Sequence, residues 1–135
     1  YHHDLNDHVA LDAGVLVGLT SGEPPRPKRF ALGGLNTLRG FERKQFQGEE
    51  MALMVFETRI FPGGVWPAFI AFWDGGSVWK NATPDVGWKS DLGLGVRWPP
   101  RSRKIFGRAD VAWPLDQVEG RDKGPQYNLR IGIPF

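Results

Sequence analysis

The stretch Trp88-Lys-Ser-Asp-Leu-Gly-Leu-Gly-Val-Arg-Trp98 decides the fold that this sequence predicts. Apolar side chains occupy every second position toward its end, and the positions between them hold Asp91, two glycines and Arg97. A period of two indicates an extended strand with two different faces, because successive side chains of a strand point to opposite sides. We therefore predict a β-strand over residues 88–98 with one apolar face and one polar face.

The same alternation recurs in five further blocks, which Gly- and Pro-rich connections separate. The blocks span residues 8–19, 50–61, 65–79, 104–115 and 126–135. We interpret them as antiparallel strands of roughly 10 to 14 residues, which is longer than an ordinary strand of about 5 to 6. A tilted strand of about 9 to 11 residues crosses a bilayer. The predicted connections alternate between long (20–48, 80–87, 116–124) and short (62–64, 99–103), an asymmetry typical of outer-membrane barrels.

Composition excludes several other classes of protein. The 135 residues include no cysteine, so neither a disulfide framework nor a cysteine-based metal site is possible. Charges are mixed, with 17 Lys and Arg against 15 Asp and Glu, which argues against a nucleic-acid-binding tail. No apolar run is long enough for a transmembrane helix. Because the chain begins at Tyr1 and shows no leader segment, we expect it to be a fragment of a longer protein.

The polar faces of the predicted strands suit a water-filled interior, and the apolar faces suit lipid. Six strands cannot close a membrane barrel, which takes about eight or more. An open edge in lipid would leave backbone groups unpaired at several kcal/mol each. We therefore expect the missing N-terminal part of a larger barrel, or additional copies of the chain, to close the sheet, and we favour the first. A soluble β-sandwich and a lipocalin-like barrel are the alternative folds.

Residues 30–41 read F-A-L-G-G-L-N-T-L-R-G-F, and residues 72–79 read F-W-D-G-G-S-V-W. These segments resemble the GG-x-x-(S/T)-(V/L)-R-G-(F/Y) loop and the F-x-D-x-G-x-V-W strand of the bacterial surface antigen family. That family includes the barrels of BamA- and TamA-type assembly factors and of two-partner secretion transporters. Further similar segments follow in the same order, at residues 57–59, 94–99 and 108–115. The resemblance implies that residues 1–135 form the last six strands of a sixteen-stranded antiparallel transmembrane β-barrel.

The resemblance also implies a site. Residues 20–49 would form a long outer loop that folds back into the lumen, where Arg39 meets Glu57 and Asp74 on the wall. Gly40 would permit a tight turn and Phe41 would pack on the inner wall. The strand pattern independently places Glu57 and Asp74 on the predicted luminal faces. The alternative is that Arg39 lies in a solvated loop.

The end of the chain carries a second signal. Aromatic or apolar side chains occupy every second position from Tyr127 through Leu129, Ile131 and Ile133 to Phe135. This pattern resembles the C-terminal β-signal by which outer-membrane barrels are recognised during assembly. Such a strand can pair its backbone with another sheet edge while alternate side chains enter pockets. An ordinary closing strand would show the same alternation.

No catalytic, cofactor-binding or metal site is predicted. The spacing of the N-terminal histidines and aspartates, namely His2, His3, Asp4, Asp7 and His8, matches no metal motif, and we expect this start of the chain to be frayed. No Ser lies in the sequence context of a nucleophile elbow. The sequence therefore predicts a protein without enzymatic activity.

The predicted function is that of a bacterial outer-membrane barrel that takes part in inserting or translocating proteins. Its expected partners are outer-membrane lipid, a client or passenger protein and the rest of the barrel, and not nucleic acid. Two alternatives stay open. The barrel could anchor or export a fused soluble enzyme such as a patatin-like phospholipase, or the chain could be a soluble β-sandwich binding module.

Overall fold

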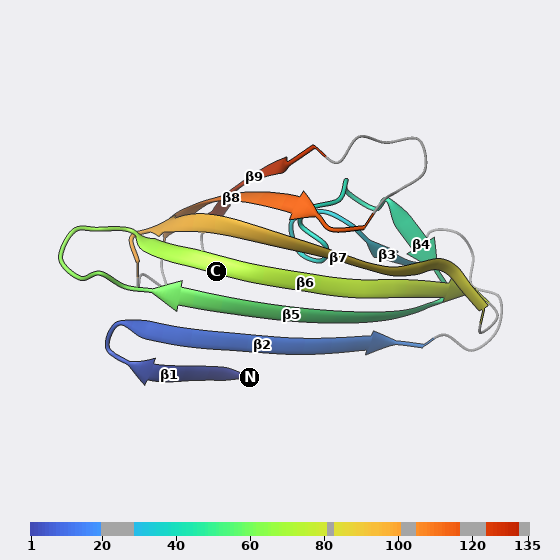
Figure 1. Ribbon diagram of the computed structural model, residues 1–135, viewed down its shortest axis with the longest axis horizontal. Coiled ribbons are helices and arrows are strands. Elements are labelled where there is room, and N and C mark those ends of the chain that lie inside the picture. The colour runs from blue at the N-terminus through green and yellow to red at the C-terminus, as the bar shows by residue number, and fades with distance from the viewer. Residues whose placement is uncertain (20–28, 81–82, 101–104, 117–123, 133–135) are drawn as a thin grey trace.

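The computed structural model describes residues 1–19, 29–80, 83–100, 105–116 and 124–132. Its main element is one antiparallel sheet of seven strands in the order β1-β2-β5-β6-β7-β8-β9 (Figure 1). These strands are β1 (His2–Asn6), β2 (Val9–Gly18), β5 (Glu50–Ile60), β6 (Ala68–Lys80), β7 (Thr83–Trp98), β8 (Phe106–Pro114) and β9 (Gln126–Gly132). In these described ranges no helix is long and apolar enough to cross a membrane. The predicted all-β antiparallel fold is confirmed.

The six predicted strands correspond to β2 and β5 to β9, but the structure contains three more. Strand β1 was not predicted, because its five residues are all exposed and show no apolar alternation. It is held by backbone pairing with β2 and by a 2.7 Å contact between His2 Nδ1 and the Asp12 carboxylate. Strands β3 (Phe30–Leu32) and β4 (Phe46–Gly48) form a separate hairpin in the stretch that was predicted to be irregular. Short pairings of this kind leave no periodic signal in a sequence.

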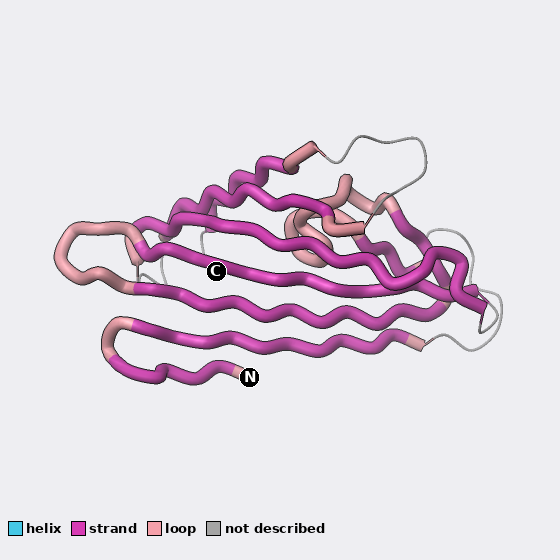
Figure 2. Tube along the Cα trace, viewed as in Figure 1, coloured by secondary structure: helices cyan, strands magenta, loops and turns pink. Residues whose placement is uncertain are grey.

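The prediction of a long loop over residues 80–87 is wrong. Strand β6 continues to Lys80 and β7 begins at Thr83, so these two strands form a tight hairpin. The sequence there is polar, but backbone pairing does not require an apolar face, and this part of β7 extends past the end of its pairing with β8 at Asp91. The end of β6 has a further partner, since the backbone N–H of Glu49 donates to the Trp79 carbonyl at 2.8 Å. Figure 2 shows strands over nearly the whole length of the sheet.

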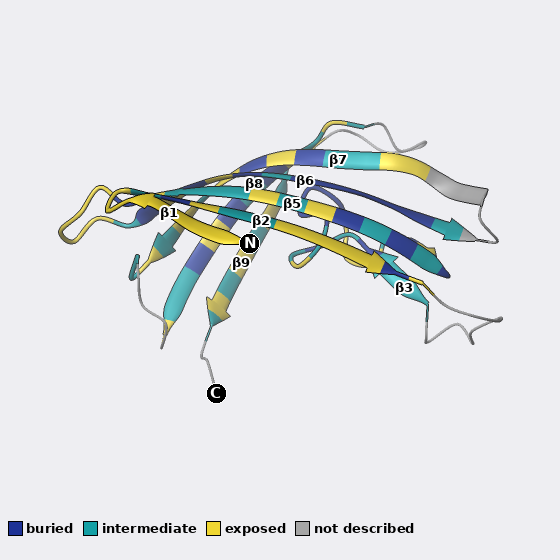
Figure 3. Cartoon of the chain, turned by 90° about the horizontal axis from the view of Figure 1, so that it is seen from below, coloured by how far each residue is buried: buried dark blue, intermediate teal, exposed yellow. Residues whose placement is uncertain are grey.

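The two faces of the sheet differ as sharply as the alternation predicts. On β7 the side chains of Leu92, Leu94 and Val96 are 47%, 56% and 41% exposed, whereas Asp91, directly before Leu92, is fully buried. Figure 3 shows the arched sheet with buried and exposed segments alternating along its strands. A sheet that buries carboxylates and exposes leucines has the opposite polarity to that of a water-soluble sheet.

The stretch between β2 and β5 packs on the inner face of the sheet with an apolar cluster of its own. Its buried members are Leu32, Leu38, Phe41 and Phe46 from the loop, Met51 and Leu53 from β5, and Val78 from β6. The rings of Phe41 and Phe46 meet edge to face, with centroids 5.3 Å apart. Burying a side chain of this size contributes about 1.5–3 kcal/mol. The cluster therefore holds residues 29–49 against β5 and β6 and positions the loop tip beside them.

Candidate loop-docking site

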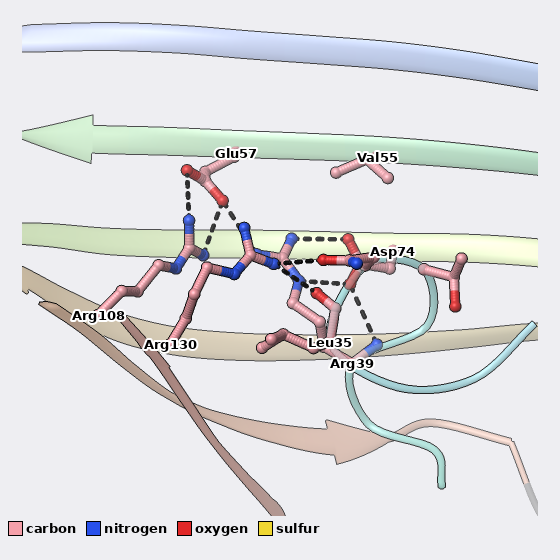
Figure 4. A pocket seen from close by; sticks show the side chains of 9 residues that line it. Leu35, Arg39, Val55, Glu57, Asp74, Arg108 and Arg130 are labelled. Carbon is pink, nitrogen blue, oxygen red and sulfur yellow. Dashed lines mark hydrogen bonds and ion pairs between the residues drawn. The ribbon is translucent and has the colours of Figure 1, made fainter. Parts of the chain in front are cut away.

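Arg39 lies at the tip of this loop and is only 6% exposed. Its Nε and Nη2 donate to the two carboxylate oxygens of Asp74 on β6 at 2.6 and 2.7 Å. Its Nη1 donates to Glu57 Oε2 on β5 at 2.9 Å, so one guanidinium joins two neighbouring strands (Figure 4). A forked, charge-assisted contact of this kind fixes geometry as well as supplying attraction.

Beneath the Arg39 guanidinium lies the ring of Phe72, whose centroid is 3.4 Å from the guanidinium carbon. Phe72 lies opposite Gly93 of β7 in the sheet, and a Cβ at Gly93 would overlap the Phe72 ring. The glycine therefore makes room for the ring, and the ring supports the cation from below. This explains physically why β7 carries glycine on its inner face at this position.

Gly40 follows Arg39 and brings the loop backbone against β7 and β8. A Cβ at Gly40 would lie 2.6 Å from the Cβ of Asp91 and 3.1 Å from the backbone nitrogen of Pro114. The tight turn predicted at Gly40 is present, because the Phe41 N–H donates to the Leu38 carbonyl at 3.2 Å across Arg39 and Gly40. Gly40 itself has no positive φ, whereas Gly33 and Gly34 of the same loop have φ of 109° and 97°. The requirement at Gly40 is thus close approach between backbone and wall rather than an unusual backbone angle.

A second arginine, Arg108 of β8, shares the carboxylate of Glu57. Its Nη1 and Nη2 donate to the two Glu57 oxygens at 3.1 and 2.8 Å. Its Nε donates to both oxygens of Asp110 at 2.9 and 2.8 Å. Arg108 and Asp110 were not among the residues predicted for the site. The signal was present, because both fall on the polar side of the alternation in residues 104–115.

Strand β9 also contacts the loop. Asn128 Nδ2 donates to the backbone carbonyl of Arg39 at 3.0 Å. Arg130 Nη2 donates to the carbonyl of Leu35 at 3.0 Å and to Asn36 Oδ1 at 2.7 Å. These contacts span more than 85 residues of sequence, and only the register of the sheet brings them together. The sequence alone does not predict these contacts for that reason.

The electrostatics of the site are set by burial. Burial by itself lowers the pKa of the Arg39 guanidinium, but the hydrogen bonds and attraction of Asp74 and Glu57 outweigh it and raise that pKa. Arg39 therefore stays charged. Asp91 lies opposite Asp74 in the pairing of β6 with β7 and is fully buried. Among the described residues, neither Asp91 oxygen has a hydrogen bond of normal geometry. The Arg39 guanidinium is thus hydrogen-bonded to Asp74 and Glu57, whereas Asp91 lies beside Asp74 without such a bond to the guanidinium.

The ion pairs line a small polar cavity of about 200 Å³, whose walls include Leu35, Arg39, Val55, Glu57 and Arg108 (Figure 4). In the part of the chain that the structure describes, no three His, Asp or Glu side chains lie together as metal ligands would. What the arrangement provides chemically is a set of paired charges that holds a loop to a wall. Whether this cluster has the predicted function stays a prediction.

The predicted C-terminal signal is described only in part. Tyr127, Leu129 and Ile131 lie on the outer face of β9 and are 79%, 75% and 73% exposed. Ile133 and Phe135 lie outside the described residues. The recognition role of this strand therefore stays a prediction.

A long-stranded antiparallel sheet with an apolar exterior and an ion-paired loop on its inner face defines an outer-membrane β-barrel protein. The chain matches the Omp85 superfamily domain over residues 2–135. It therefore belongs to the Omp85 superfamily, whose members are β-barrels of the bacterial outer membrane.

Among curated proteins, the chain is similar to the outer membrane protein assembly factor BamA of Nitratidesulfovibrio vulgaris. The two are 27% identical over 150 aligned residues, which cover 97% of this chain and 18% of that protein. The chain thus spans less than a fifth of the length of this relative. No solved structure matches it significantly.

Proposed function

We propose that this chain forms the C-terminal part of a barrel that takes part in the insertion or translocation of proteins at the bacterial outer membrane. Membership of the Omp85 superfamily and the similarity to a BamA assembly factor support this function. The observation that carries it is the contact of Arg39 with Asp74 and Glu57 on the inner face of the sheet. No covalent step or nucleotide is part of the proposal.

In this proposal residues 20–49 are an outer loop that occupies the lumen and braces the wall. The described part of the loop is attached in two ways, by the apolar cluster around Phe41 and by the ion pairs of Arg39. The first attachment is insensitive to charge, whereas the second depends on it. A client or passenger protein and outer-membrane lipid are the proposed partners, and the remaining strands of a longer protein would close the sheet.

The test replaces Arg39 in the full-length protein and measures insertion of a client barrel into membranes. Arg39→Ala should lower insertion strongly while the protein keeps its heat-modifiable mobility, because the strands do not depend on this side chain for pairing. Arg43→Ala is the matched control, since Arg43 is an exposed arginine of the same loop. Full insertion activity together with an unchanged protease resistance of the loop in Arg39→Ala would refute the proposal.

We further propose that the C-terminal strand acts as the assembly signal of this barrel. The exposed outer row of Tyr127, Leu129 and Ile131 supports this, because a second chain can read alternate side chains on one face. Deleting Phe135 from the full-length protein should reduce the fraction that reaches the membrane as a folded barrel. A normal yield of heat-modifiable protein after the deletion would contradict this role.

A further inference from the structure

Asp91 is a buried carboxyl group that the ion pairs of Arg39 do not account for. It lies directly opposite Asp74 in the pairing of β6 with β7, and both side chains are fully buried. Side chains in opposite positions of two paired strands have their Cβ atoms about 4.5–5.5 Å apart, so the two carboxyl groups adjoin each other. The strand pairing therefore brings two acidic groups together inside the protein.

The charges around Asp91 do not balance two carboxylates. Asp74 accepts from Arg39 Nε and Nη2 at 2.6 and 2.7 Å, a contact that holds Asp74 in its ionised form. From the described elements packed against Asp91, the groups that face it are Asp74 on β6, Pro114 on β8, and Arg39 and the N–H of Gly40 in the loop. Lys89, on the same face of β7, lies opposite Gly76 instead. One cation thus faces two buried carboxyl groups.

The hydrogen bonds indicate which of the two groups holds a proton. An ionised carboxylate can only accept, and among the described residues no donor reaches either Asp91 oxygen with normal geometry. A protonated carboxyl group instead donates one bond through its O–H. Asp74 can accept that bond, because in the described part of the chain its Oδ1 accepts one bond, from Arg39 Nη2, whereas its Oδ2 accepts from both Nε and the backbone N–H of Arg39. The neutral form of Asp91 is therefore satisfied where the ionised form is not.

From this geometry we propose that Asp91 is a positioning residue, which carries a proton at neutral pH and donates its O–H in a hydrogen bond to the Asp74 carboxylate. Two adjacent buried carboxyl groups repel strongly if both are ionised, and the group that is paired with a cation keeps the charge. The O–H of Asp91 orients Asp74 toward Arg39, and β6 and β7 together present a single negative charge there. When the proton leaves at alkaline pH, repulsion replaces the hydrogen bond and the contact of Arg39 with Asp74 weakens.

The first arm of the test looks for the protonated carboxyl group directly. Infrared spectra of the full-length protein in lipid vesicles should contain a carboxylic-acid C=O band at neutral pH that disappears at alkaline pH. Asp91→Asn should lack this band, because an amide cannot carry the proton. Asp4→Asn is the matched control, since the Asp4 side chain is 70% exposed, and it should keep the band. A band of equal size in the two variants would overturn the proposal.

The second arm measures the pH dependence that a merely structural role of Asp91 would not produce. Hydrogen exchange of the loop, corrected for the direct effect of pH on amide chemistry, should become about tenfold faster in the wild type between neutral and alkaline pH. In Asp91→Asn it should stay constant, since the amide still donates to Asp74 and cannot ionise. Asp91→Leu removes the donor and should exchange faster at both pH values. A pH profile of Asp91→Asn identical to that of the wild type would overturn the proposal.

This inference deepens the proposed function and rests on it only for the role of the ion pair, so the two can fail separately. Loss of the infrared band in Asp91→Asn, together with full client insertion by Arg39→Ala, would retain the shared proton and reject the functional proposal. Insertion that depends on Arg39, together with a band that Asp91→Asn does not remove, would reject the shared proton alone.

Discussion

The two faces of β6 and β7 obey opposite requirements. The outer row of β7, with Leu92, Leu94 and Val96, is about half exposed and touches little else in the chain. The inner row, with Asp91 and Gly93, is buried under Phe72 and the loop. The outer face needs only to be apolar, whereas the inner face needs particular side chains at particular places. The comparison shows that the identity of individual side chains matters most on the charged inner face of the sheet.

The strongest test of the comparison removes one inner charge. Asp74→Asn leaves Arg39 buried with its main partner neutral, and it should cost about 3–5 kcal/mol in the free energy of unfolding. Guanidinium unfolding of the full-length protein in lipid vesicles measures this. Asp4→Asn, at a side chain that is 70% exposed, is the control and should change little. A similar small change in both variants would show that the ion pair does not hold the inner face together.

A charge placed on the outer face should cost somewhat less. Leu94→Arg puts a cation where we expect lipid tails, and about 2–4 kcal/mol is typical for such a change at the middle of a membrane barrel. Leu94→Ile is the control, because it keeps the position apolar. The same unfolding experiment in vesicles applies. If Leu94→Arg were neutral, the outer row would face water and the soluble β-sandwich would return as the better interpretation.

A smaller effect is expected from a single methyl group on the inner face. Gly93→Ala places a Cβ against the Phe72 ring, and overpacking of this kind costs about 1–3 kcal/mol. Because the displaced ring supports the Arg39 guanidinium, loop exchange should increase in step with the loss of stability. Gly87→Ala serves as the control, since nothing lies within 4 Å of a Cβ at Gly87. Equal stability of the two variants would contradict the close contact of ring and strand.

The smallest effect should have the opposite sign. Asp91→Asn removes a buried carboxylate that lies opposite Asp74 and has no hydrogen bond of normal geometry among the described residues. At alkaline pH, where both carboxyl groups carry charge, relief of this like-charge pair should stabilise the docked loop by about 1 kcal/mol. Slower hydrogen exchange of the loop measures the gain. Faster exchange would mean that Asp91 contributes to holding the loop, so that the inner face uses both carboxylates.

The sequence predicted the strands and the division between the faces because both follow from local alternation. It also placed Glu57 and Asp74 on the inner side, since parity along a strand is a local property. It could not place Asn128 and Arg130 beside the loop, because their contacts depend on the register of four strand pairings. Strand β1 escaped prediction for another reason, namely that its five residues are all exposed and show no alternation of apolar and polar side chains.

The close packing of the Phe72 ring over Gly93 has a consequence for the evolution of the family. Any relative that gains bulk at the position of Gly93 has to lose it at the position of Phe72, and the reverse exchange is equally constrained. These two sites should therefore change together across diverging lineages, although 21 positions separate them along the chain. If an alignment of relatives contained a chain with large side chains at both positions, the arginine of that chain would have to be supported by a different contact.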